Sequence, residues 1–294
     1  MDIESVCAEF LTYCKHERQL ASNTIAAYDQ DLAEFRKAFV GRDINNICGH
    51  ELVAYAHRLG TDRALAPTTV KRRVAPLKAM FSRLARQGAI PQNPFGSVDL
   101  RLRIPRRLPR CLGTAEIGAM VEASIAGCPT TRLAALLFFC TGIRVSELAS
   151  VHVGDIDLDQ RTIRIFGKGS RERQVFLPDD SLVDLICAYV KDRHQYSETS
   201  KRLLLNARGH PTSASCLRNR IKKLATVARL SRVVTPHMLR HTAATALMEA
   251  GVDIRFVQRL LGHHSIATTQ IYTHVSDRAL KAAVLGANVC GRFN

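Results

Sequence analysis

The chain has 294 residues, of which 46% are hydrophobic, so it is long enough to form about two domains with sizeable cores. Its 42 Lys and Arg residues against 26 Asp and Glu leave a formal net charge of +16, which favours a nucleic-acid partner, although a basic ribosomal or membrane-surface protein would show the same excess. No apolar run reaches the roughly 18 residues of a membrane span, and no basic segment followed by an apolar one opens the chain, so we expect a cytoplasmic protein with no membrane partner.

Basic charge is spread along the whole chain, because residues 1–112 carry a net charge of +7 and the remaining residues carry +9. This distribution favours two domains facing one polyanion over a neutral enzyme with a basic tail, although solvent-exposed surface charge would give the same pattern. The nine cysteines form no Cys-x-x-Cys pair and lie mostly within apolar helical patterns, which predicts reduced, buried thiols.

The first part of the chain has the apolar spacing of four helices. They are predicted over residues 3–19, from Ser22 to Phe39, around residues 52–59, and from Pro67 onward, with Ser22 capping the second helix. We therefore predict a helical amino-terminal domain over residues 1–96.

The fourth predicted helix also carries six basic residues, which could follow a DNA backbone or form an ordinary solvent-exposed helix face. These residues are Lys71, Arg72, Arg73, Lys78, Arg83 and Arg86. Both interpretations fit the residues equally well.

Residues 97–112 are predicted to form an extended basic linker, because Pro105 and Pro109 prevent a helix there and Asp99 is the single acidic residue. Such a segment could be a solvated hinge, a strap that contacts the phosphates of a duplex, or both. Its arginines are Arg101, Arg103, Arg106, Arg107 and Arg110.

Residues 113–294 are predicted to form a second domain that is mostly α with a small antiparallel β-sheet (α+β). Thr114 is expected to cap one helix, and a second helix ends at Gly142, directly before Arg144. Between residues 153 and 177 the apolar period changes to alternation, which predicts the sheet and places Lys168 at a turn between two strands. The residues expected on its apolar face are Ile156, Leu158, Ile163, Ile165, Val175 and Leu177.

Two later helices carry polar residues at their ends. A Thr-Pro start signature places His237 and Arg240 on one face of the first two turns of a helix, where backbone N–H groups favour an anion. A further short helix ends at Gly262, so that His263 could donate a hydrogen bond to a phosphate, with His264 as its competitor.

Six residues of the second domain together suit attack on a phosphodiester. Two arginines and two histidines could bind the phosphate, a lysine could protonate the leaving oxygen, and a tyrosine could be the nucleophile, with no metal or other cofactor. They are Arg144, Lys168, His237, Arg240, His263 and Tyr272.

The strings that contain these residues resemble the tyrosine recombinase (phage integrase) family, and most of all its Xer-type branch. The resemblance covers roughly residues 112–275, in the family's order and with all six expected positions filled. The strings are TGIRVSEL at residues 141–148, GKGSRER at 167–173, HMLRHT at 237–242, LGH at 261–263 and TTQIYTH at 268–274.

The resemblance implies an amino-terminal core-binding (SAM-like) domain that contacts DNA through Lys71, Arg72, Arg73 and the linker arginines, followed by a catalytic domain with a carboxy-terminal exchange helix. It selects His263 over His264 and implies that Tyr272 forms a 3'-phosphotyrosyl link while Lys168 protonates the leaving 5' oxygen. It also implies that four copies, alone or with a partner recombinase, act on two double-stranded DNA sites with a specific core.

Two alternatives remain at this stage. A type IB topoisomerase uses a similar constellation to relax a single duplex, and a DNA-binding accessory protein could keep the scaffold without the chemistry. The outcome of recombination, whether integration, excision, inversion or dimer resolution, does not follow from the residues.

Overall fold

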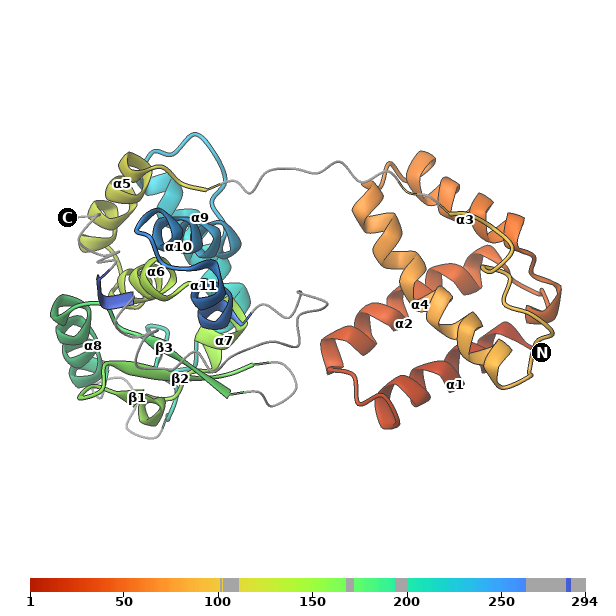
Figure 1. Cartoon of the computed structure of the whole chain (residues 1–294), viewed down its shortest axis with the longest axis horizontal. Helices are drawn as coiled ribbons and strands as arrows, with labels where there is room; N and C mark the ends of the chain where they lie inside the picture. The colour runs from red at the N-terminus through yellow and green to blue at the C-terminus, as the bar shows by residue number, and fades with distance from the viewer. Residues whose placement is uncertain (101, 103–110, 168–171, 194–199, 263–283, 287–294) are drawn as a thin grey trace. The chain divides into compact units, whose positions relative to one another are not determined.

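The computed structural model describes residues 1–100, 102, 111–167, 172–193, 200–262 and 284–286. The chain divides into two units, Met1–Arg107 and Leu108–Asn294 (Figure 1). Each unit has its own hydrophobic core. The predicted fold class, mostly α with one small antiparallel sheet, is confirmed.

The described residues of the first unit form four α-helices and one short 3-10 helix around a core rich in aromatic residues. Helix α2 packs against α1 and α4, and α3 packs against α4. Phe35 lies at the centre of this core, where its ring contacts those of Phe39, Tyr55 and Phe81. The elements are α1 (Ile3–His16), α2 (Ser22–Ala38), η1 (Ile44–Asn46), α3 (Gly49–Thr61) and α4 (Pro67–Arg86).

The second unit is built around one buried helix, α6, of which ten of 13 residues are buried. Helices α5, α8, α9 and α10 all pack against α6. Figure 1 shows the sheet on one side of this group of helices. The helices are α5 (Thr114–Ile125), α6 (Pro129–Thr141), α7 (Val145–Ser150), η2 (Val153–Asp155), α8 (Asp180–Arg193), α9 (Ala214–Val227), α10 (Pro236–Glu249) and α11 (Ile254–Leu261).

The sheet has the antiparallel order β1-β2-β3, with β1 (Ile156–Asp157), β2 (Thr162–Phe166) and β3 (Glu172–Phe176). Ile163 pairs with Val175, and both side chains are buried as their alternation predicted. Leu158 was expected on the same apolar face but is 39% exposed, because β1 ends at Asp157 and Leu158 lies in the following turn.

Two expected helix caps are wrong by one residue. Helix α2 begins at Ser22 itself, since the carbonyl of Ala21 already accepts the first helical hydrogen bonds. Helix α5 likewise begins at Thr114 itself, and its N-cap is Gly113. The Glu116 carboxylate accepts a hydrogen bond of 2.9 Å from the backbone N–H of Gly113, which is one half of a capping box.

The expectation of buried, reduced cysteines is only partly correct. Cys7 is a buried free thiol, but Cys48, Cys128 and Cys187 are exposed. Cys48 and Cys128 lie at the N-caps of α3 and α6, outside the helical residues that pack into the cores. Cys140, buried in α6, is disulfide-bonded.

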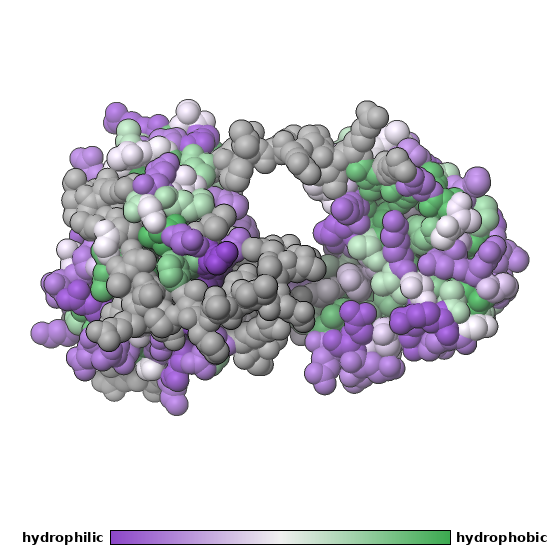
Figure 2. Space-filling view, in the orientation of Figure 1, coloured by the Kyte–Doolittle hydropathy of each residue, from purple (hydrophilic) through white to green (hydrophobic). Residues whose placement is uncertain are grey.

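On the face drawn in Figure 2, hydrophilic residues cover most of the described surface of each unit, with hydrophobic residues in smaller areas between them. Within the described part of the chain, no helix is both long and apolar enough to cross a membrane.

Gly142 is the residue on which the geometry at the end of α6 depends, and its replacement by Ala should destabilise the second unit. Its backbone is left-handed, with φ +61°, and an added Cβ would lie 2.5 Å from Leu261 Cδ2. The left-handed backbone alone should cost about 1–2 kcal/mol of unfolding free energy, and the contact with Leu261 should add to it. Urea unfolding curves measure the change.

Two other glycines of the same unit separate these effects. Gly251 has φ +85° and open space around it, so Gly251→Ala should show the backbone cost alone. Gly154 has neither constraint, so Gly154→Ala should be nearly neutral. If Gly142→Ala cost no more than Gly251→Ala, close packing at Gly142 would have no energetic role.

Candidate active site

Arg144 is fixed by the way α6 ends. Gly142 reverses the chain in the left-handed conformation, and the apolar neighbours Ile143 and Val145 are both buried. Arg144 is then the N-cap of α7, so its backbone is held on both sides while its side chain stays partly exposed. This arrangement is the one that the helix stop at Gly142 predicted.

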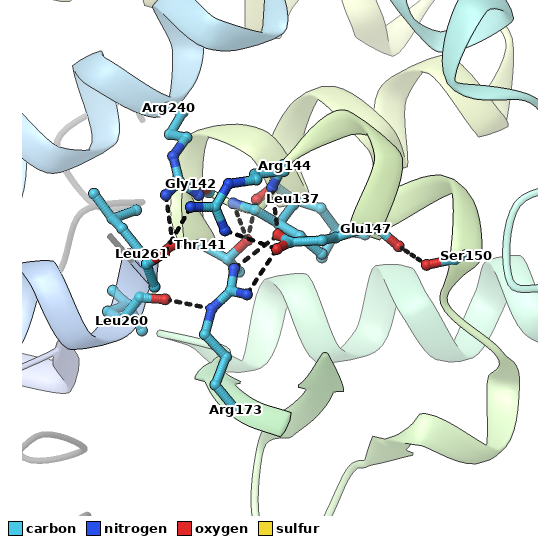
Figure 3. A network of polar contacts seen from close by, with 12 residues as sticks. Leu137, Thr141, Gly142, Arg144, Glu147, Ser150, Arg173, Arg240, Leu260 and Leu261 are labelled. Atoms are coloured by element: carbon cyan, nitrogen blue, oxygen red, sulfur yellow. Dashed lines mark hydrogen bonds and ion pairs between the residues drawn. The ribbon is translucent and has the colours of Figure 1, made fainter. Parts of the chain in front are cut away.

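Glu147 is the centre of the polar network around Arg144 (Figure 3). Its side chain is only 6% exposed and accepts four hydrogen bonds. Two come from Arg144, through the backbone N–H and Nη1, each at 2.9 Å. The other two come from Nη1 and Nη2 of Arg173, each at 2.8 Å. One carboxylate therefore holds two guanidinium groups.

Glu147 is ionised at neutral pH. Burial opposes ionisation, but the hydrogen bonds and charge of Arg173, together with the bonds from Arg144, outweigh it and lower the pKa of Glu147 to about 2. The carboxylate is therefore a permanent negative charge between the two arginines.

Arg240 reaches the same place from α10. It is 4% exposed, and its Nη1 donates to the carbonyl oxygen of Gly142 at 2.7 Å, while Nη2 donates to that of Leu261. Burial and the positive charge of Arg144 lower the pKa of Arg240 to about 10, so it remains protonated at neutral pH.

The three arginines bind three successive carbonyl groups at the end of α11, of which Figure 3 labels the first two residues, Leu260 and Leu261. Arg173 Nε donates to Leu260 at 2.8 Å, Arg240 donates to Leu261, and Arg144 Nη2 donates to Gly262 at 2.7 Å. These carbonyls are the ones that a helix end leaves without intrahelical partners. The contacts therefore join α7, β3 and α10 to the end of α11.

His237 lies in the first turn of α10, one turn before Arg240. Its side chain is solvent-accessible, but partial desolvation and the positive charge of Arg240 lower its pKa. His237 is therefore neutral at physiological pH and able to accept a proton, as a general base must. The structure thus brings together Arg144 and Arg240, with His237 on the same helix face as Arg240.

The remaining predicted catalytic residues and all five predicted linker arginines lie outside the described residues, so these assignments stay predictions. In the sequence, Lys168 falls between β2 and β3. His263 directly follows Gly262, the last of the three residues whose carbonyl groups bind the arginines. The residues concerned are Lys168, His263, Tyr272, Arg101, Arg103, Arg106, Arg107 and Arg110. Most of the predicted carboxy-terminal exchange helix also lies there.

The basic residues of α4 differ in their surroundings. Lys71 is exposed. Arg72 is half-exposed and makes two hydrogen bonds to the buried Asp31 of α2, the longer at 2.9 Å. Arg73 is only 16% exposed, and its guanidinium also faces Asp31, with Nε 3.8 Å from the carboxylate. Arg73 therefore helps to hold α4 on α2, and DNA contact by these three residues stays a prediction.

Arg173 is the site residue to which sequence reasoning gave no role. Val175 and Leu177 were predicted to face inward, and Arg173 shares their face of β3. An arginine at an inward strand position needs a buried partner, and this signal could have identified it. Among the residues that the structure describes, no group of His, Cys, Asp or Glu is placed to hold a metal ion.

Comparison with protein families gives two matches. The model described as "Phage integrase family" matches residues 111–279, and the one described as "Phage integrase, N-terminal SAM-like domain" matches residues 7–88. A tyrosine recombinase of Agathobacter rectalis is 33% identical, covering 94% of this chain and 93% of its own. Tyrosine recombinase XerC of Lactobacillus leichmannii is 34% identical, covering 93% and 95%.

Solved structures share the fold. A crystal structure of XerA recombinase has a TM-score of 0.52 at 27% identity and covers 95% of this chain and 96% of its own. A lambda integrase dimer bound to a core site has a TM-score of 0.73 at 19% identity, with 94% and 100% covered. The family match over more than half of the chain and the full-length relatives show that the chain belongs to the phage integrase family and is a tyrosine recombinase, an enzyme of site-specific DNA recombination.

Proposed function

We propose that this chain cuts and rejoins double-stranded DNA at a specific core site through a 3'-phosphotyrosyl intermediate. The observation that carries the proposal is the convergence of Arg144 and Arg240, whose guanidinium groups come from different helices and bind adjacent carbonyls of α11. Two guanidinium groups held beside each other in a partly buried place are suited to the two nonbridging oxygens of a phosphate.

In the proposed reaction, the Tyr272 oxygen forms a bond to phosphorus while the bond from phosphorus to the 5' oxygen breaks. His237, neutral at physiological pH, accepts the tyrosine proton, and Lys168 gives a proton to the leaving 5' oxygen. Arg144, Arg240 and His263 stabilise the charge of the phosphorane. A 5'-hydroxyl of a second strand then reverses these steps, so rejoining requires no ATP.

The proposed assembly follows from the relatives. Lambda integrase has been seen as a dimer bound to a core site and as a tetramer bound to a Holliday junction. We infer that this chain also works as a tetramer on two DNA sites, alone or with a partner recombinase, and in the cytoplasm, where DNA is accessible to it.

We propose that the two parts of the chain have different roles in the reaction. Residues 1–96 would bind the core site, with Lys71, Arg72 and Arg73 among the contacting residues, and the arginines of the 97–112 linker would add further contacts. Residues 113–294 would carry the chemistry. The basic charge of both parts supports this division, because each would face the same phosphate backbone.

Replacing Tyr272 by Phe should abolish the covalent adduct and leave DNA binding within about twofold, because it removes the nucleophilic oxygen and leaves the arginine pair intact. Wild-type protein trapped on genomic DNA identifies the core site, and a nicked duplex with that site then reports a denaturant-resistant adduct. Tyr189→Phe is the control, since it removes a buried hydroxyl bonded to Thr130 in the same unit and should still form the adduct. An adduct formed by Tyr272→Phe would disprove the assignment.

Replacing Arg144 or Arg240 by Ala should slow single-turnover cleavage about 100- to 1000-fold, or roughly 3–4 kcal/mol, as for the loss of a donor to a developing oxyanion. Arg240→Ala also leaves the carbonyls of Gly142 and Leu261 without a partner, which should cost about 1–3 kcal/mol of stability. Unfolding curves separate the two losses, and Arg240→Lys, which keeps the charge, supplies a second variant. Cleavage at the wild-type rate would remove the residue from the site.

A substrate with sulfur in place of the bridging 5' oxygen should distinguish Lys168 from the arginines. Sulfur leaves as a thiolate of low pKa and needs no proton, so Lys168→Ala should be strongly impaired on ordinary DNA and close to wild type on the sulfur substrate. Arg144→Ala should gain little from the same change. Equal impairment of Lys168→Ala on both substrates would mean that Lys168 positions DNA and does not donate the proton.

A further inference from the structure

Arg173 uses every nitrogen of its guanidinium group inside the protein. Nη1 and Nη2 bind the two oxygens of Glu147, and Nε binds the carbonyl oxygen of Leu260, all at 2.8 Å. The side chain is 14% exposed and packs against Gly262, where an added Cβ would lie 3.3 Å from Arg173 Cδ. This arginine is therefore directed at protein groups, in contrast to the more exposed Arg144.

The partners of Arg173 join three segments from which the proposed catalytic groups extend. Arg173 itself lies on β3, the strand that follows the turn containing Lys168. Glu147 holds Arg144, and the Leu260 carbonyl lies three residues before His263. A shift of Arg173 would therefore move the parts of the site relative to one another.

The sharing of Glu147 between Arg144 and Arg173 determines how much of the positive charge of Arg144 is neutralised and where its guanidinium group lies. With both arginines present, each receives part of one negative charge, and Arg144 keeps an Nη2 group on Gly262. Without Arg173, two lone pairs of a buried carboxylate would lose their donors, and its remaining partner would be Arg144. Glu147 would then draw the Arg144 guanidinium toward itself and neutralise more of its charge, at the expense of the phosphate.

We propose that Arg173 is a positioning residue of the recombination reaction, which holds Glu147 and the carbonyl end of α11 so that Arg144 faces the scissile phosphate. Arg173 touches no substrate and acts through Arg144. The proposal rests on the proposed function, because it requires Arg144 to bind the phosphate in the transition state.

The first experiment compares Arg173→Ala and Arg173→Lys with wild type on the nicked duplex carrying the trapped core site. We expect DNA affinity within about twofold of wild type and single-turnover cleavage slowed about 10- to 100-fold, the size of effect found when a group that orients a metal ligand is removed. Lys should not restore the rate, because an ammonium group cannot form the two parallel bonds to Glu147 while also binding Leu260.

Arg164→Ala is the matched control. Arg164 lies on the neighbouring strand β2, is half-exposed, and approaches Asp155 and Glu172 at 3.7 Å, so its loss should leave cleavage unchanged. Unfolding curves identify any variant that fails to fold. If Arg173→Ala fails to fold, Arg173→Lys still provides the test. Wild-type cleavage by a folded Arg173→Lys would overturn the proposal.

A double-mutant cycle shows through which residue Arg173 acts. If it acts through Arg144, the Arg144→Ala/Arg173→Ala variant should cleave no more slowly than Arg144→Ala alone, whereas multiplied losses would overturn the proposal. The sulfur substrate adds a second readout. Arg173→Ala should remain slow on it, as Arg144→Ala does, and recovery would mean that Arg173 serves the leaving group.

The outcome for Arg173 is distinguishable from failure of the proposed function. If wild-type protein forms no covalent adduct with DNA, the proposed function fails. If wild type forms the adduct and Arg173→Lys matches its rate, only the role of Arg173 fails.

Discussion

The catalytic unit depends on one buried carboxylate shared by two arginines. An ion pair removed from water loses several kcal/mol of solvation, and it is tolerated only when every lone pair and donor finds a partner. Glu147 meets this condition with four hydrogen bonds from Arg144 and Arg173. Because two of these bonds come from β3 and two from the start of α7, the carboxylate fixes the sheet and α7 in one geometry.

The end of α11 is held by the same cations. A helix C-terminus carries unpaired carbonyls and partial negative charge, and cations near it are stabilising. Here three guanidinium groups supply the missing donors to residues 260–262. The hydrogen bonds that orient the three arginines therefore also hold the end of α11 in place. Gly142 allows this close packing, because a side chain at that position would collide with Leu261.

Local patterns in the sequence were sufficient for features that depend on neighbouring residues. The stop at Gly142, the alternation of β2 and β3, and the Thr-Pro start of α10 each follow from a few adjacent side chains, and all are present in the structure. The same patterns placed Arg144, His237 and Arg240 at the ends of their helices.

Features that join distant segments could not be predicted in this way. Arg73 and Asp31 lie 42 positions apart, and periodicity gives no indication that an arginine on α4 turns toward a buried aspartate on α2. The bond from Arg173 to Leu260 spans 87 positions. An inward-facing arginine indicates that a buried partner exists, but its identity is set by the packing of the whole unit.

The charge of the site explains how it could favour a transition state over a bound substrate. Arg144, Arg173 and Arg240 are cations, Glu147 is an anion, and His237 is neutral, so this cluster carries a net charge of two positive units at neutral pH. A phosphodiester carries one negative charge, whereas the phosphorane formed by attack of a tyrosinate carries two.

Burial is the main cause that lowers the pKa of Arg240, and the positive charge of Arg144 lowers it further because the two cations repel each other. A ground-state phosphate offsets one of these positive charges, whereas the dianionic phosphorane offsets two, and in the proposed reaction the proton accepted by His237 adds one more positive charge beside it. Interactions that strengthen only as the transition state forms accelerate the chemical step, whereas equal binding of substrate and transition state does not. The sharing of Glu147 by two arginines keeps this cluster positively charged, because a second carboxylate would lower its net charge by one unit.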